Sequence, residues 1–113
     1  MTNYGRISSV SALTRLCSVD DLSPGEMQLI ELEGMDPLLL CNSEGSFHLV
    51  DDECTHAIAS LSEGRLEGHT VFCPLHGGSF DVRSGKALTL PCKQALRTFP
   101  IVVEDGAVFL RRG

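Results

Sequence analysis

The chain has 113 residues, which suits one domain, and 42% of them are apolar and 21% charged, as in an ordinary soluble globular protein. The net charge of −6 argues against a nucleic-acid partner, and no apolar run approaches the length of a membrane span. Residues 1–16 lack the basic start and apolar core of a secretory signal, so we expect a cytoplasmic protein with reduced thiols.

Glycine and proline interrupt the first half of the chain at short intervals, which is typical of many short strands. Residues 1–11 have no clear pattern and are predicted to be a loose arm. Ser43-Glu44-Gly45 predicts a hairpin turn between the last two strands of this half. The strands predicted here are 13–18, 27–32, 38–42 and 47–51, and residues 20–25 form a turn or a single helical turn.

The second half of the chain contains a short predicted strand at 70–72 and a hairpin near its end. That hairpin joins strands 100–104 and 107–111 through Asp105-Gly106. Asp-Gly between alternating apolar runs is a strong hairpin signal, because both turn residues tolerate a positive φ. The predicted fold class is therefore all-β.

Residues 54–80 interrupt the strand pattern and contain two pairs of possible metal ligands. Cys54 and His56 form Cys-x-His, and Cys73 and His76 form Cys-x-x-His, with sixteen residues between the pairs. Small residues follow each pair. The pattern predicts a β scaffold that presents two loops towards each other, each with one thiolate and one imidazole.

Two cysteines and two histidines can bind zinc or a pair of iron ions. Cys₂His₂ is a standard structural zinc site, but its usual spacing pairs Cys with Cys and His with His. If each loop supplies one thiolate and one imidazole, the two loops together can bring both thiolates to one iron and both imidazoles to the other. That is the ligand set of a Rieske [2Fe–2S] centre. We favour the two-iron centre and keep zinc as the alternative.

The motifs resemble the two boxes of Rieske proteins at the expected separation. Residues 60–64 and 79–113 are similar to the small Rieske ferredoxins of bacterial ring-hydroxylating dioxygenase systems, with the carbazole and biphenyl dioxygenase ferredoxins as the nearest comparison. The resemblance covers roughly residues 13–111. It implies a Rieske fold, with an antiparallel β-sandwich or barrel-like base and a small two-loop cluster-binding subdomain. Residues 1–113 then form a single domain, with 54–80 as that subdomain.

The resemblance also implies a function. In that family the ferredoxin passes single electrons from a flavin-containing, NAD(P)H-oxidising reductase to a terminal oxygenase. Carried over to this chain, Cys54 and Cys73 hold the buried iron, and His56 and His76 hold the outer iron of a [2Fe–2S] cluster. We therefore expect a monomeric electron carrier that is not itself an enzyme. The alternatives are the small Rieske-type subunit of a nitrite reductase and a zinc-stabilised interaction domain.

Differences from the Rieske proteins of cytochrome bc-type complexes concern the surroundings of the cluster. Ala59 and Leu75 stand where those proteins have two disulfide-bonded cysteines. Gly78 and Phe80 stand where they have a serine and a tyrosine whose hydroxyls raise the potential, and Ser79 is expected to point elsewhere. Fewer donors stabilise the reduced cluster less, so we predict a potential on the order of −150 mV.

The remaining cysteines and histidines are expected to have structural roles. Cys17 and Cys41 lie in predicted strands and should be buried thiols. Cys92 follows Pro91 in a segment that covers the cluster in the family, and we expect it to be a packed neighbour rather than a ligand. The two histidines outside the motifs, His48 and His69, are expected to be exposed.

Overall fold

The computed structural model describes residues 12–75 and 77–112, so the loose arm predicted at 1–11 lies outside the described residues. The described chain consists of short antiparallel strands and two 3-10 helices, which confirms the all-β prediction. No helix in this part is long and apolar enough to cross a membrane. The elements are β1 (Leu13–Ser18), η1 (Val19–Asp21), β2 (Met27–Ile30), β3 (Leu38–Ser43), β4 (Ser46–Asp51), η2 (Leu61–Glu63), β5 (Arg65–Glu67), β6 (Thr70–Phe72), β7 (Ser79–Asp81), β8 (Ala87–Thr89), β9 (Thr98–Phe99), β10 (Ile101–Glu104) and β11 (Ala107–Arg111).

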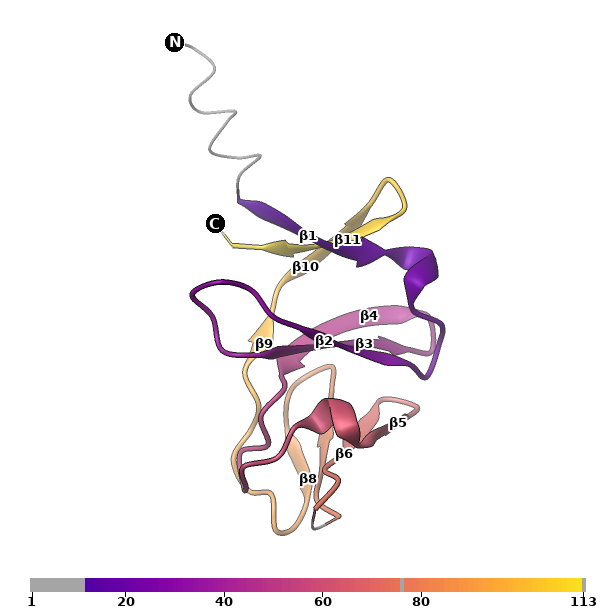
Figure 1. Cartoon of the computed structure of the whole chain (residues 1–113). Coiled ribbons are helices and arrows are strands. Elements are labelled where there is room, and N and C mark those ends of the chain that lie inside the picture. The colour runs from indigo at the N-terminus through magenta and orange to yellow at the C-terminus, as the bar shows by residue number, and fades with distance from the viewer. Residues whose placement is uncertain (1–11, 76, 113) are drawn as a thin grey trace.

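The strands form three sheets that lie one above another in Figure 1. In the first sheet β11 lies between β1 and β10. The turn from β10 to β11 has Asp105 at φ 52° and Gly106 at φ 75°. Both values are left-handed, as a type I′ hairpin turn requires, so the Asp-Gly hairpin prediction is confirmed.

The second sheet has the order β2-β3-β4-β9. β3 and β4 form the predicted hairpin, with the left-handed residues Glu44 and Gly45 at its turn. β2 ends at Ile30, two residues before the predicted end of its strand.

Strand β3 separates two apolar cores, because alternate residues of a strand face opposite sides of its sheet. Leu38 and Leu40 pack in the core shared with the first sheet. Leu39 and Cys41 pack in the core shared with the third sheet, and all four side chains are fully buried. The second of these cores also contains Cys54, Cys73 and Cys92.

The third sheet, β5-β6-β7-β8, carries the segment with the two motifs. Its central hairpin pairs Val71 on β6 with Phe80 on β7, and both side chains are completely buried in the second core. This pairing fixes where the β6–β7 loop begins and ends. The sheet continues beyond residue 80, since β8 pairs with β7.

Candidate metal centre

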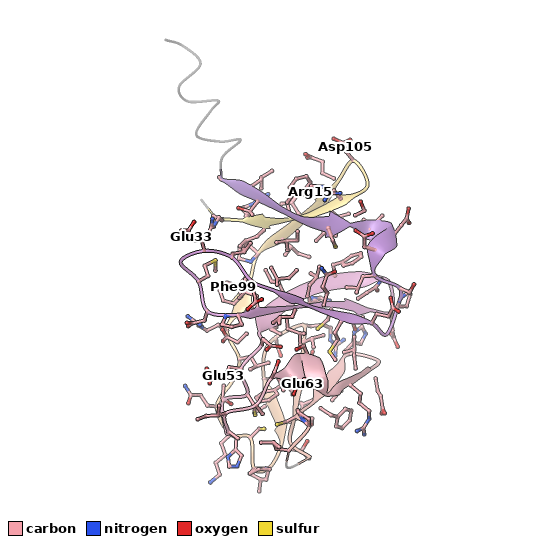
Figure 2. The ribbon with its side chains drawn as sticks, in the orientation of Figure 1. Arg15, Glu33, Glu53, Glu63, Phe99 and Asp105 are labelled. Atoms are coloured by element: carbon pink, nitrogen blue, oxygen red, sulfur yellow. The ribbon has the colours of Figure 1, made fainter. Side chains whose placement is uncertain are left out.

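The two motifs lie in the half of the molecule that the third sheet forms. Glu53 and Glu63, which flank the loop of the first motif, lie in this half, whereas Arg15 and Asp105 mark the opposite end (Figure 2). The candidate centre is therefore separated from the first sheet by the whole of the second.

A buried carboxylate organises the first loop, which runs from β4 to η2. Asp52 is only 4% exposed, and it accepts hydrogen bonds from the Ser60 hydroxyl and from the backbone N–H of Ser62, the latter at 2.9 Å. The backbone N–H of Cys54 donates to the carbonyl of Ala59 at 3.0 Å. These bonds close the loop and fix the backbone on both sides of the Cys-x-His motif.

The second loop joins β6 to β7 and is closed in a similar way. The backbone N–H of Cys73 donates to the carbonyl of Gly78 at 2.8 Å. Gly77 has φ 75°, a left-handed conformation that glycine adopts without strain. His76, the histidine of this motif, lies outside the described residues.

The two loops bring Cys54 and Cys73 together. Both cysteines are 4% exposed and belong to the same buried cluster, and Cys73 is close enough to influence the pKa of Cys54. Burial by itself would raise the pKa of the Cys54 thiol, but hydrogen bonds from the backbone of His56 and from Cys73, followed by Ala57 and Cys92, lower it overall. A lowered thiol pKa favours the thiolate, which is the form that binds metal.

The histidine of the first motif differs from these cysteines in its position. His56 is exposed, so the first loop buries its sulfur and presents its imidazole at the surface. Among residues 12–75 and 77–112, no group of three or more His, Cys, Asp or Glu side chains is placed to hold a metal ion. The described ligand candidates are two buried thiols and an exposed imidazole. This donor set fits a two-iron centre, whose thiolates and imidazoles bind different irons.

A third segment, residues 90–96, packs against both loops. Cys92 is 4% exposed, and its Sγ atom lies 3.8 Å from Sγ of Cys54. The Thr55 hydroxyl donates to the Gln94 carbonyl at 2.7 Å, which fastens the first loop to this segment. Desolvation, with smaller contributions from Cys54 and Cys73, raises the pKa of the Cys92 thiol to about 12. Cys92 packs against Cys54, as expected, and the expectation that it is not itself a ligand stays a prediction.

An ion-pair network braces the end of that segment against β4. The Arg97 guanidinium lies 2.8 Å from the Asp51 carboxylate and 3.1 Å from that of Asp36. The backbone N–H of Arg97 donates to Asp51 at 2.8 Å, and the backbone N–H of Asp51 donates to the Arg97 carbonyl at 3.2 Å. The start of the first loop and the end of the third segment are therefore held side by side.

The residues after the second motif place no hydroxyl towards the cysteines. Ser79 is buried, and its hydroxyl is paired with that of Thr89, the residue opposite it on β8. Phe80 is completely buried and has no donor. All five cysteines, which lie within the described residues, are free, so no disulfide ties the loops together. Cys17 and Cys41 are buried, as predicted.

Large apolar side chains are exposed on all three segments of this end. Ile58 of the first loop is 93% exposed, and Leu75 of the second loop and Leu90 of the third segment are also exposed. We call these three residues the apolar rim. Large apolar side chains exposed on loops that pack together are candidates for contact with another protein.

The expected exposure of the other two histidines is wrong, because the β3–β4 turn packs against the β5–β6 turn. His69 is half-buried, with Nδ1 on the hydroxyl of the buried Ser43 and Nε2 3.1 Å from the Glu44 carboxylate. His48 on β4 is also half-buried, and desolvation, followed by the charges of His69 and Arg83, lowers its pKa.

Comparison with known proteins assigns the chain to a family. The sequence pattern described as "Rieske [2Fe-2S] domain" matches residues 12–100. The ferredoxin component of biphenyl 2,3-dioxygenase from Rhodococcus jostii (strain RHA1) is 48% identical over 99 residues, which are 88% of this chain and 92% of the relative. The ferredoxin component of the p-cumate 2,3-dioxygenase system from Pseudomonas putida is 40% identical over 114 residues, covering 100% of this chain and 97% of the relative.

The fold gives the same result. A chain in the solved complex of reduced oxygenase and oxidised ferredoxin of carbazole 1,9a-dioxygenase superposes with a TM-score of 0.85. That chain is 36% identical in sequence, and the match covers 88% of this chain and 93% of the other.

Proposed function

The chain belongs to the Rieske [2Fe–2S] domain family, and on that premise we propose that it is the electron-carrying ferredoxin of an aromatic-ring-hydroxylating dioxygenase system. Relatives that match nearly their whole length are ferredoxin components of such systems. A Rieske [2Fe–2S] cluster is the cofactor of the family, and when bound it takes up and releases one electron.

We propose that Cys54 and Cys73 hold the inner iron and that His56 and His76 hold the outer one. The described residues support this division, because both cysteines are buried side by side while His56 is exposed. The backbone N–H groups that donate to the Cys54 sulfur hold it in place and favour its thiolate form. The role of His76 is proposed from its place in the Cys-x-x-His motif alone.

The residues of this chain supply a protected interior and an accessible edge. The second core keeps water from the cysteines, since Leu61, Val71 and Phe80 are completely buried there. The imidazole of His56 and the apolar rim lie at the surface, where a partner protein can come close. We propose that the partner that receives the electron covers this end.

The partners follow from the relatives. In the carbazole 1,9a-dioxygenase complex, a ferredoxin is bound to an oxygenase. We propose that this chain likewise delivers electrons to a terminal oxygenase and receives them from a flavin-containing, NAD(P)H-oxidising reductase. In this role it is a carrier without a reaction of its own. We further propose a monomeric cytoplasmic protein in which residues 1–113 form one domain and 54–80 carry the cluster.

The observation that carries the proposal is the meeting of Cys54 and Cys73, from two separate Cys/His motifs, in one buried site. The test is a reconstituted electron-transfer assay that contains NADH, a flavin reductase, this protein and a ring-hydroxylating oxygenase. We expect substrate-dependent NADH oxidation that requires this protein. Cys54→Ser should abolish it, whereas Cys17→Ser, which alters a cysteine in β1, should retain it. Transfer to a nitrite reductase but to no ring-hydroxylating oxygenase would contradict the proposal.

A further inference from the structure

A third buried thiol lies beside the two cysteines of the centre. Sγ of Cys92 is 3.8 Å from Sγ of Cys54, and the two residues are 38 positions apart in sequence. The backbone N–H of Cys92 donates to the Thr89 carbonyl at 3.1 Å, which holds this residue in place at the end of β8. The inference drawn from this contact rests on the proposed function, since it assumes that Cys54 is a cluster ligand.

The space for this sulfur exists because residue 78 is glycine. A Cβ atom on Gly78 would lie 2.3 Å from Sγ of Cys92, far closer than ordinary contact, and 3.3 Å from its Cβ. The second loop thus has no side chain at Gly78, and the thiol of Cys92 from the third segment occupies that space. The two positions are complementary, and the Cys92 sulfur is confined against Cys54.

The hydrogen bonds around Cys54 show which group can serve as its side-chain donor. The side chain that the structure places in sulfur contact with Cys54 is that of Cys92, at 3.8 Å. Cys73 is a proposed ligand and carries no proton when metal is bound. Ser79 and Phe80 do not compete, because the Ser79 hydroxyl is paired with Thr89 and Phe80 has no donor. Cys92, enclosed in the core, retains its S–H group.

We propose that Cys92 is a positioning residue that donates an S–H···S hydrogen bond to the Cys54 ligand sulfur and thereby raises the reduction potential. Reduction adds one negative charge to the cluster and its sulfur ligands. A donor aimed at a ligand sulfur stabilises the reduced form more than the oxidised form. Removing the donor therefore makes reduction less favourable.

The test is the midpoint potential of the loaded protein and of three variants. In Cys92→Ala we expect the ratio of reduced to oxidised protein, at a fixed applied potential, to fall roughly two- to tenfold, as for the loss of one hydrogen bond. Cys92→Ser keeps a donor and should recover at least part of this loss. Cys17→Ala, in the other apolar core, should leave the ratio unchanged.

The sign of the shift separates the proposal from a merely structural role. If Cys92 only excludes water, shortening its side chain exposes the cluster to solvent. The reduction potential should then shift equally in Cys92→Ala and Cys92→Ser. An unchanged or higher potential in Cys92→Ala would overturn the proposal, as would equal shifts in Cys92→Ala and Cys92→Ser.

A measurement on the unaltered protein keeps the proposal testable if the variants do not assemble a cluster. Infrared spectra of the S–H stretch should contain a band that moves to lower frequency on reduction, because the Cys54 sulfur becomes a stronger acceptor. The bands of Cys17 and Cys41 should not move, and Cys17→Ala identifies one of them. A set of S–H bands that is indifferent to reduction would refute the hydrogen bond. It would leave cluster content and electron delivery, which test the proposed function, untouched.

Discussion

The buried carboxylate of Asp52 accepts a hydrogen bond at 2.9 Å from the backbone N–H of Ser62, across the loop that contains the first Cys/His motif. The same carboxylate accepts the Ser60 hydroxyl. One side chain that is only 4% exposed therefore fixes both the entry and the exit of the loop. The position of Cys54 and His56 therefore depends on a residue outside the two Cys/His motifs.

Replacing this carboxylate should destabilise the protein and loosen the cluster. In Asp52→Ala the half-buried donors of Ser60 and Ser62 lose their buried acceptor, so we expect the free energy of unfolding to fall by about 1–3 kcal/mol. Urea unfolding and the rate of bleaching of the visible spectrum measure both effects. The exposed Asp20 provides the control, and Asp20→Ala should match the unaltered protein. Equal stability of the two variants would show that the loop is held by other contacts.

The close packing of Gly78 against Cys92 makes a double-mutant cycle informative. Gly78→Ala forces a Cβ to within 2.3 Å of the Cys92 sulfur, and we expect it to lower the free energy of unfolding by about 1–3 kcal/mol. Cys92→Ala removes that sulfur, so the double variant should lose less than the sum of the two single losses, by about 0.5–3 kcal/mol. Chemical denaturation of the four proteins gives this coupling. Strict additivity would contradict the packing described.

Acid should destabilise the protein in part through His48. Its pKa is lowered from 6.5 by desolvation and then by the charges of His69 and Arg83, so the unfolded chain binds the proton more tightly than the folded chain. The resulting stability is present above the unfolded value of 6.5 and is lost as the pH falls through the lower folded value.

The difference between His48→Gln and the unaltered protein isolates this contribution. The variant should lose less stability between about pH 7.5 and about pH 5.5, measured by urea unfolding at each pH. The Asp81 carboxyl, whose pKa is lowered chiefly by its hydrogen bond to Arg83, titrates below 3.8 and stays outside this window. Parallel pH profiles of the two proteins would show that His48 does not contribute.

The apolar rim should matter for partner binding but not for the cluster itself. Ile58→Asp places a charge on a side chain that is 93% exposed, and we expect kcat/KM for the oxygenase to fall roughly five- to tenfold at an unchanged midpoint potential. Val103→Asp makes the same change on β10, in the first sheet, and should have no effect. If both variants transfer electrons equally well, the partner docks elsewhere.

The sequence was sufficient for the base and for the ligand motifs. The hairpin turns at Glu44-Gly45 and Asp105-Gly106 can be predicted from the local sequence, because each turn requires residues that tolerate a left-handed conformation. Strand β1 matches its predicted limits. Except for β6, the strands of two or three residues, such as β5, β8 and β9, were not predicted, because they are too short for a period of two to be visible. β9 forms by pairing with β4, which is distant in sequence, whereas β5 and β8 pair with the neighbouring strands β6 and β7.

Contacts that depend on the folded arrangement were beyond a reading of the sequence. The proximity of Cys92 to Cys54 and the bond between His69 and Ser43 join residues 38 and 26 positions apart, with no local signal. The low reduction potential stays a prediction. The structure places no hydroxyl of residues 78–80 towards the cysteines, in keeping with it, whereas the donor that we propose at Cys92 acts in the opposite direction.

Whether the centre holds two irons is decided by the iron and acid-labile sulfide content of the purified native protein, together with its spectrum after reduction. We expect two irons and two sulfides per chain, a brown-red colour and a Rieske-type EPR signal in the reduced state. A colourless protein that contains zinc and neither iron nor sulfide would contradict this expectation.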